Sequence, residues 1–137
     1  MNVNCGVDLI RISRIEKAVK KYGGSFVNRI WTAQEQQVAT TAASLAARFA
    51  GKEALAKALG SGIGPSGVSW TDLEILKNTN GAPVVHLHGA ARLLYEQNKG
   101  ISLSLSLSHD GDLAQAFCVI LCMNPLDGSN ADEVQYN

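Results

Sequence analysis

The stretch R-F-A-G-K-E-A-L-A-K-A-L-G, residues 48–60, decides the predicted fold, because its alanines and leucines are typical of a buried helix. On a helical wheel, alanines group on one side, where another backbone can come close, and leucines group roughly opposite. Arg48 and Lys52 fall inside the leucine sector, while Glu53 and Lys57 lie at the border between the two sectors. A helix that is apolar on two sides has little solvated surface, so these four charges require an explanation.

The pair Glu53 and Lys57 has two interpretations. The residues are spaced i, i+4 in the favourable order, and such a pair stabilises an exposed helix by about 0.2–0.5 kcal/mol. The alternative is a functional site, for which Glu53 needs a second carboxylate. Asp8 is the candidate, because an aspartate inside the apolar run 7–10 usually caps a turn, pairs with a base or binds a ligand. Two such carboxylates and a lysine can hold Mg²⁺ and phosphate oxygens, although the sequence alone does not show that they meet.

The composition is that of one globular domain. The chain has 137 residues, 46% of them hydrophobic and 18% charged, so it can bury a core. Its net charge of zero argues against a general nucleic-acid binder. No apolar stretch reaches the length of about 18 residues that a membrane span needs, and the N-terminal residues M-N-V-N-C-G-V-D do not match a signal peptide. We therefore expect a cytoplasmic protein without a membrane or nucleic-acid partner.

The cysteines and histidines are assigned structural places. The chain has three cysteines, and Cys118 and Cys122 lie in the apolar run F-C-V-I-L-C-M, which predicts small, reduced and buried side chains. His86 and His88 form an H-x-H pair on a predicted strand. Because zinc needs further ligands and none cluster nearby in the sequence, we expect exposed strand histidines.

The first half of the chain is predicted to be mainly helical after a short strand at residues 3–8. Ser13 and Glu16 fit a capping box that opens a helix ending at Tyr22, before a Gly-Gly pair. Thr32 and Glu35 fit a second capping box. Helical character then continues to the glycine at position 60, with a break predicted near residues 40–41.

The second half is predicted to be mainly strands. Residues 61–67 form a Gly- and Pro-rich loop, and the strands expected at 68–77 and 83–88 flank an Asn-Gly turn. A short helix is expected at 90–97, and S-L-S-L-S-L-S-H at 102–109 alternates as a strand does. The run from position 113 to 123 is apolar at nearly every residue, which predicts a strand buried on both faces. The predicted fold is α+β, with N-terminal helices packed on a mostly antiparallel sheet. We expect a single domain over residues 1–123 and a polar, acidic tail over 124–137.

Four separated segments together match one family. They are G-V-D-L-I-R-I-S-R-I (6–15), F-x-x-R-I-W-T-x-x-E (26–35), the helix 48–60 and S-L-S-H-D (106–110). In this order and at these distances, the chain resembles holo-acyl-carrier-protein synthases, the small bacterial type of 4′-phosphopantetheinyl transferase. The resemblance implies the phosphopantetheinyl transferase fold and the transfer of 4′-phosphopantetheine from coenzyme A to a serine of apo-acyl carrier protein, with release of adenosine 3′,5′-bisphosphate. The alternative is a non-catalytic module of the same fold that binds coenzyme A or an acidic protein.

The resemblance also implies roles for particular residues. Asp8 and Glu53 are expected to bind Mg²⁺, with Glu53 or a metal-bound water as the base, and Lys57 is expected to contact the phosphates. Gly60 and His109 are expected to lie along the coenzyme A site. Members of the family are usually homotrimers with each active site between two subunits. We therefore expect the remaining helix charges, Arg48 and Lys52, to face a neighbouring subunit or the substrate.

A basic surface precedes this site in the sequence. Between positions 11 and 21 a single acid, Glu16, stands among five bases: Arg11, Arg14, Lys17, Lys20 and Lys21. Such a run is often only a solvated helix face. Because acyl carrier proteins are acidic, the resemblance gives it a second interpretation, in which these bases steer and dock the carrier protein.

Overall fold

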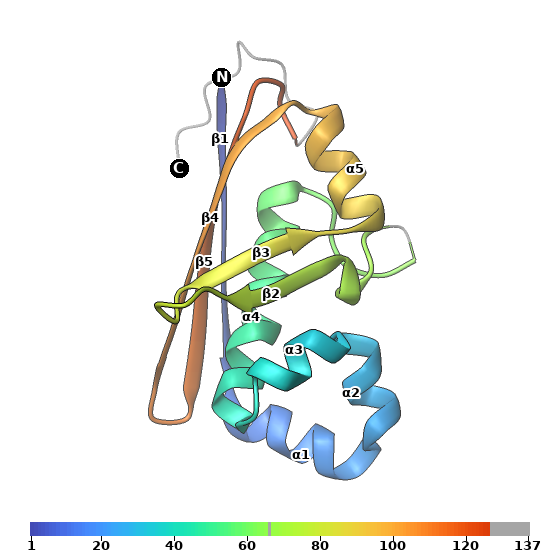
Figure 1. Ribbon diagram of the computed structural model, residues 1–137, viewed down its shortest axis with the longest axis vertical. Helices are drawn as coiled ribbons and strands as arrows, with labels where there is room; N and C mark the ends of the chain where they lie inside the picture. Colours follow the sequence, from blue (N-terminus) through green and yellow to red (C-terminus); the bar gives the residue numbers. More distant parts are fainter. Residues whose placement is uncertain (66, 127–137) are drawn as a thin grey trace.

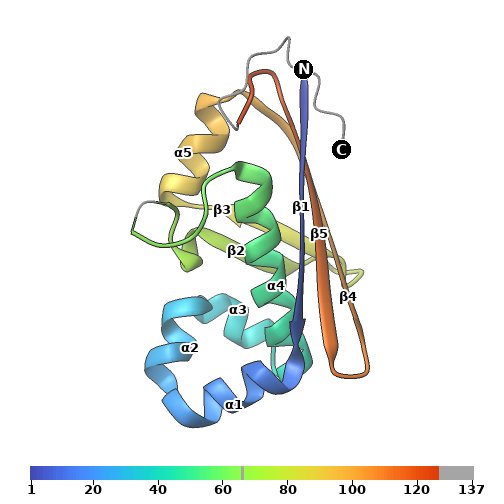
Figure 2. The same ribbon diagram turned by 180° about the vertical axis from the view of Figure 1, so that it is seen from behind.

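The computed structural model describes residues 1–65 and 67–126, and it has the predicted α+β architecture. In chain order the elements are β1 (Asn2–Arg11), α1 (Ile12–Tyr22), α2 (Gly24–Ile30), α3 (Ala33–Val38), α4 (Ala42–Leu59), the 3-10 turn η1 (Trp70–Asp72), β2 (Leu73–Lys77), β3 (Pro83–Leu87), α5 (Gly89–Gln97), β4 (Gly100–Asp110) and β5 (Leu113–Cys122). Two antiparallel sheets form, one in the order β1–β5–β4 and one of β2 and β3. The helices α1 and α2 lie at one end of the molecule and α5 lies at the other (Figure 1; Figure 2).

The helix α4 is the centre of the packing. The side chain of Thr41 accepts a hydrogen bond from Ser44 N at its start, and Gly60 ends it in the left-handed conformation with φ of 71°. The helix packs against β1 and β5 of the larger sheet and also contacts β2. Where α4 meets β1, a Cβ on Gly6 would overlap the carbonyl oxygen of the buried Ala54. Small residues on both elements therefore bring the two backbones together, as the alanine side of the helix predicts.

The strand β5 differs from its prediction. Its side chains alternate between buried and exposed instead of being buried on both faces. The cause is that α4 covers only one face of the three-stranded sheet, so Leu113 and Phe117 remain 40% and 46% exposed. The prediction of burial on both faces was therefore wrong for the single chain. The uncovered side, which we call the outer sheet face, carries exposed apolar side chains from β1 and β5: Val3, Val7, Leu9, Leu113 and Phe117.

The helix α1 also begins differently from its prediction. It starts at Ile12, the N-cap position is Arg11, and no side chain at that position caps the helix. Ser13, the predicted N-cap, lies inside the first turn and donates from both N and Oγ to the carboxylate of Asp112. The predicted capping box with Glu16 was wrong, because the acceptor comes from the distant turn between β4 and β5.

Other local predictions are confirmed. Thr32 Oγ1 accepts a hydrogen bond from Glu35 N at 3.1 Å, and Thr32 N donates to Glu35 Oε1 at 3.0 Å, which is a complete capping box. The helical region breaks between Val38 and Ala42, where α3 ends and α4 begins. The β2–β3 hairpin turns at an Asn-Gly pair, with φ of 84° at Gly81.

The cysteines and His86 lie where they were predicted, whereas His88 lies just beyond the strand, at the N-cap position of α5. Cys118 and Cys122 are free and buried, and burial raises the pKa of the Cys118 thiol to about 12. His86 and His88 are exposed. His88 Nε2 lies 3.1 Å from Glu74 Oε1, and within residues 1–65 and 67–126 no group of three or more potential ligands could hold a metal ion.

The C-terminal part is described as far as Leu126, which is buried although it falls within the predicted tail. The rest of the predicted tail, residues 127–137, lies outside the described residues. Among the helices of the described ranges, none combines the length and the apolar character needed to cross a membrane.

Candidate active site

Asp8 and Lys57 meet where β1 runs along α4. Asp8 lies on the face of β1 that is turned toward α4, and its side chain is 23% exposed. Lys57 Nζ lies 3.5 Å from Asp8 Oδ1 and donates a 2.8 Å hydrogen bond to the carbonyl oxygen of Val7. Lys57 is therefore directed to β1, instead of forming the ordinary helix pair with Glu53 that its spacing allows.

Glu53 completes this cluster from α4. Its pKa is raised, chiefly by burial and then by the neighbouring carboxylate of Asp8, while Lys57 acts in the opposite direction. The effect of Asp8 means that the two carboxylates face a common region, which the sequence could not show. The structure thus brings together the three residues predicted to carry the chemistry.

The donor chemistry of the cluster suits a hard divalent cation. Asp8 makes ionisation of Glu53 more costly, a positive charge between the two carboxylates would offset this cost, and Mg²⁺ prefers oxygen ligands. Mg²⁺ usually keeps several waters and takes one or two protein carboxylates together with substrate phosphates. Asp8 and Glu53 therefore fit such an ion as a partial ligand set.

Gly60 and His109 lie apart from these carboxylates. Gly60 is exposed at the C-terminal end of α4, one turn beyond Lys57. His109 is exposed near the end of β4, and its partner on β5 is Ala114, which in turn pairs with Ile10 on β1. The strand β5 thus separates His109 from the strand that carries the aspartate, so one chain does not bring this histidine against the carboxylate cluster.

The predicted basic surface extends from the end of β1 along the whole of α1. All five of its bases are exposed, and Lys20 forms an exposed pair with Glu16 at 3.4 Å. Only Ile12 and Ile15 of α1 are buried. Four of the bases belong to α1, whose first residue comes four positions after Asp8, and Arg11 is the last residue of β1.

Arg48 and Lys52 were predicted to face a neighbouring subunit or the substrate, and that prediction was wrong. Lys52 is fully buried and donates to Glu35 Oε1 at 2.8 Å and to the carbonyl oxygens of Trp70 and Leu73. Arg48 donates from Nε to the Ile75 carbonyl at 2.9 Å. Both charges are satisfied inside the chain, where they join α4 to β2 and the segment before it.

Sequence reasoning did not find the partner of Lys52, although two signals pointed to it. Lys52 stood in the leucine sector, where a solvated lysine is unexpected, and Glu35 is the second member of a predicted capping box. Glu35 is fully buried and accepts from Thr32 N, Lys52 Nζ and Ile75 N. Burial lowers the pKa of Lys52, while the carboxylate of Glu35 opposes that shift.

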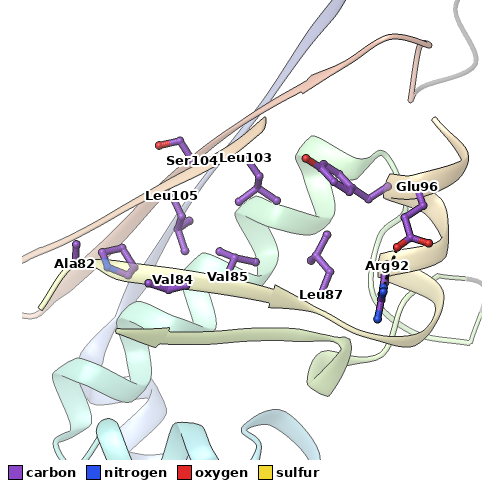
Figure 3. Close-up of a pocket in the computed structure, with 11 residues that line it drawn as sticks. Ala82, Val84, Val85, Leu87, Arg92, Glu96, Leu103, Ser104 and Leu105 are labelled. Carbon is purple, nitrogen blue, oxygen red and sulfur yellow. Dashed lines mark hydrogen bonds and ion pairs between the residues drawn. The ribbon is translucent and has the colours of Figure 1, made fainter. Parts of the chain in front are cut away.

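A pocket of about 600 Å³ lies between β3, α5 and β4 (Figure 3). Val85 and Leu87 from β3 face Leu103 from β4, and the ion pair of Arg92 with Glu96 lies at the α5 end. None of the predicted site residues lines this pocket. The carboxylate cluster between β1 and α4 is therefore a separate place on the molecule.

Comparison with known proteins gives this site its class. Residues 4–118 match the 4′-phosphopantetheinyl transferase superfamily. The holo-[acyl-carrier-protein] synthase of Herpetosiphon aurantiacus is 46% identical over 120 residues, covering 83% of this chain and 94% of the relative. That of Protochlamydia amoebophila is 42% identical, covering 87% and 98%. The crystal structure of the Helicobacter pylori holo-[acyl-carrier-protein] synthase in complex with coenzyme A has a TM-score of 0.78 and 36% identity, covering 85% of this chain and 99% of that one.

The chain belongs to the 4′-phosphopantetheinyl transferase superfamily. Within that superfamily, its similar relatives are named holo-[acyl-carrier-protein] synthases.

Proposed function

We propose that this chain transfers the 4′-phosphopantetheine group from coenzyme A to a serine of apo-acyl carrier protein, as a holo-[acyl-carrier-protein] synthase. The observation that carries the proposal is the meeting of Asp8, Glu53 and Lys57 between β1 and α4. Relatives with the synthase name match most of the chain, and a solved relative is a complex with coenzyme A.

The reaction forms a bond between the serine oxygen and the phosphorus that carries pantetheine, and it breaks the pyrophosphate bond to release adenosine 3′,5′-bisphosphate. Such a transfer depends on positioning and charge stabilisation more than on covalent machinery. The ammonium of Lys57 is suited to neutralise phosphate charge. The serine proton needs a base, for which the Glu53 carboxylate is proposed; a water held by the ion would be the alternative base.

Asp8 and Glu53 are proposed to hold Mg²⁺, which when bound stabilises the negative charge of the pyrophosphate. The Lys57 ammonium lies 3.5 Å from Asp8 Oδ1 and also donates to the Val7 carbonyl. We propose that Lys57 exchanges its contact with Asp8 for the phosphates when substrate binds. Gly60 and His109 are proposed to contact coenzyme A.

A homotrimer is proposed as the working assembly. The outer sheet face exposes large apolar side chains, including Leu9 at 57% and Phe117 at 46%. An exposed apolar patch of this kind is typical of a protein–protein interface. A second copy packed against this face would bury them. Because β5 separates His109 from the strand of Asp8, a site between two subunits would also allow one copy to supply His109 to the carboxylate cluster of its neighbour.

The basic surface of α1 is proposed to dock the acidic carrier protein, because exposed bases of one sign accelerate and orient encounter with an acidic partner. The expected location is the cytoplasm, and the three free cysteines agree with reducing conditions there.

The experiment that separates the enzyme from a binding module measures adenosine 3′,5′-bisphosphate. Coenzyme A, Mg²⁺ and this chain should release it only when an apo-carrier protein is present. Calorimetric binding of coenzyme A without product in the presence of a competent carrier would instead establish the non-catalytic module.

A further inference from the structure

The turn between β4 and β5 holds the first turn of α1 through a single residue, Asp112. Its carboxylate accepts hydrogen bonds from Ser13 N at 2.8 Å and Ser13 Oγ at 2.6 Å, and its carbonyl oxygen accepts from Ile12 N at 2.7 Å. The first N–H groups of a helix normally find their acceptor on an N-cap side chain, and Arg11 provides none. Asp112 therefore caps α1 from 99 positions away from Ser13 in the sequence.

This cap sets the direction of the helix that is proposed to dock the carrier. The helix α1 follows β1 without a linker, so the angle at which it leaves the strand decides where its bases lie relative to Asp8. Only Ile12 and Ile15 of the helix are buried, and the side of α1 that faces water carries the bases. Together with the burial of Ile12 and Ile15, the three hydrogen bonds to Asp112 constrain the first turn.

The negative charge of Asp112 is unfavourable for the binding of an acidic carrier protein. Hydrogen bonds from Ser13 chiefly lower the pKa of Asp112, and Arg11 and Lys17 lower it further. An acidic carrier would have to compete with this carboxylate for those two bases. The carboxylate of Asp112 therefore does not serve to attract the carrier, and its role is to fix the direction of α1.

We propose that Asp112 is a positioning residue for the carrier protein. It fixes the angle at which α1 presents Arg14 and Lys17, so that the serine of a docked carrier arrives beside Asp8. The inference rests on the proposed function and concerns the binding of the carrier protein, not the binding of coenzyme A. Loss of Asp112 should therefore weaken the use of carrier protein while the use of coenzyme A is retained.

The experiment compares three variants with matched chemistry. Asp112→Ala removes the cap, Asp112→Asn removes the charge but keeps an acceptor for Ser13 N, and Glu96→Ala removes an exposed carboxylate on α5, at the opposite end of the molecule (Figure 1). We expect Asp112→Ala to raise the KM for apo-carrier by about five- to tenfold, the scale of a lost helix cap. In Asp112→Ala, the KM for coenzyme A and kcat should stay within about twofold of the wild type. Glu96→Ala should keep the wild-type KM for carrier, and Asp112→Asn should keep it or lower it.

Two results would overturn the inference. One is an unchanged carrier KM in Asp112→Ala; the other is an equal rise in Asp112→Ala and Asp112→Asn, which would assign the effect to charge. If Asp112→Ala does not fold by circular dichroism, Ser13→Ala replaces it, because it keeps the backbone bond and loses only the hydroxyl bond. A carrier KM that rises by about two- to threefold in Ser13→Ala supports the inference, and an unchanged one overturns it.

Charge reversal of Arg14 and Lys17 separates this inference from the proposed function. If the reversal leaves the carrier KM and its salt dependence unchanged, the docking role of α1 is wrong and the positioning role of Asp112 is wrong with it. If the reversal raises KM and Asp112→Ala does not, the docking surface stands and the positioning role alone is wrong.

Discussion

The ammonium of Lys57 lies 3.5 Å from Asp8 Oδ1 and 2.8 Å from the carbonyl oxygen of Val7. This contact joins the helix that carries Glu53 to the strand that carries Asp8. It also places a positive charge beside two carboxylates, where the proposed mechanism needs first a metal ion and then the phosphates of coenzyme A. Three charged groups from two elements thus form one site.

Replacement of either carboxylate is predicted to remove activity. Asp8→Asn and Glu53→Gln keep the shape of the side chains but lose the charge that a divalent cation needs, so we expect transfer to fall by at least about 100-fold. Initial rates with an apo-carrier protein, measured over a range of Mg²⁺ concentrations, check this. Glu96→Gln, which alters an exposed carboxylate on α5, should retain full activity. Full activity in either site variant would reject the metal assignment.

Glu53→Gln is also predicted to stabilise the fold at neutral pH. Burial and Asp8 raise the pKa of Glu53 above its ordinary value of 4.5, so the folded state holds this proton more tightly than the unfolded state. Stability therefore falls as pH rises through the window between these two values, and the neutral variant avoids that loss. After discounting for solvent screening, we expect a gain on the order of 0.5 kcal/mol, or roughly 1–3 °C in Tm, at pH 7.5.

Thermal unfolding of both proteins at pH 7.5 and near pH 4 measures this effect. The difference between variant and wild type should shrink at the lower pH, where Glu53 is mostly protonated in both states. A variant that is less stable than the wild type at pH 7.5 would contradict the assigned cause of the pKa shift.

Lys52→Met is predicted to destabilise the chain strongly. It leaves the fully buried carboxylate of Glu35 without its cation, and breaking a buried pair in this way costs about 3–5 kcal/mol. Urea unfolding measures the loss, with Lys77→Met, at an exposed lysine, as the control. A loss below about 1 kcal/mol would mean that the pair contributes little.

Phe117→Asp is predicted to break the proposed trimer. Phe117 lies on the outer sheet face, where a charge would be buried without a partner in a subunit interface. Light scattering after size exclusion should give the mass of three chains for the wild type and a smaller mass for the variant. Leu93→Asp, at a similarly exposed apolar residue of α5, should leave the assembly intact. A wild-type monomer, or a variant that stays trimeric, would contradict the proposed interface.

Local patterns in the sequence predicted the structure correctly where hydrogen-bond donors and acceptors are close neighbours along the chain. The capping box of Thr32 and Glu35 forms as predicted, because both partners lie within one helical turn. The box predicted at Ser13 does not form, because Asp112 offers a stronger, charged acceptor from a turn that no local pattern connects to the helix. Spacing rules describe neighbours along the chain, whereas this acceptor is set by the topology of the sheet.

Longer-range relationships were the ones that the sequence could not settle. The partner of Lys52 is Glu35, 17 positions away on another helix, and the lysine's place in the leucine sector indicated only that a partner was needed. The strand β5 was predicted to be buried on both faces, because an apolar pattern does not distinguish the face that α4 covers from the outer sheet face. The resemblance to a known family named Asp8 and Glu53, and the structure added that they lie together.

The most direct test of the central proposal is the intact mass of an apo-acyl carrier protein after incubation with this chain, coenzyme A and Mg²⁺. We predict that the carrier gains the mass of one phosphopantetheine group on its serine, and that chelation of the metal or the Asp8→Asn substitution prevents this gain. A carrier that an established transferase modifies but that keeps its apo mass with this chain would contradict the proposal.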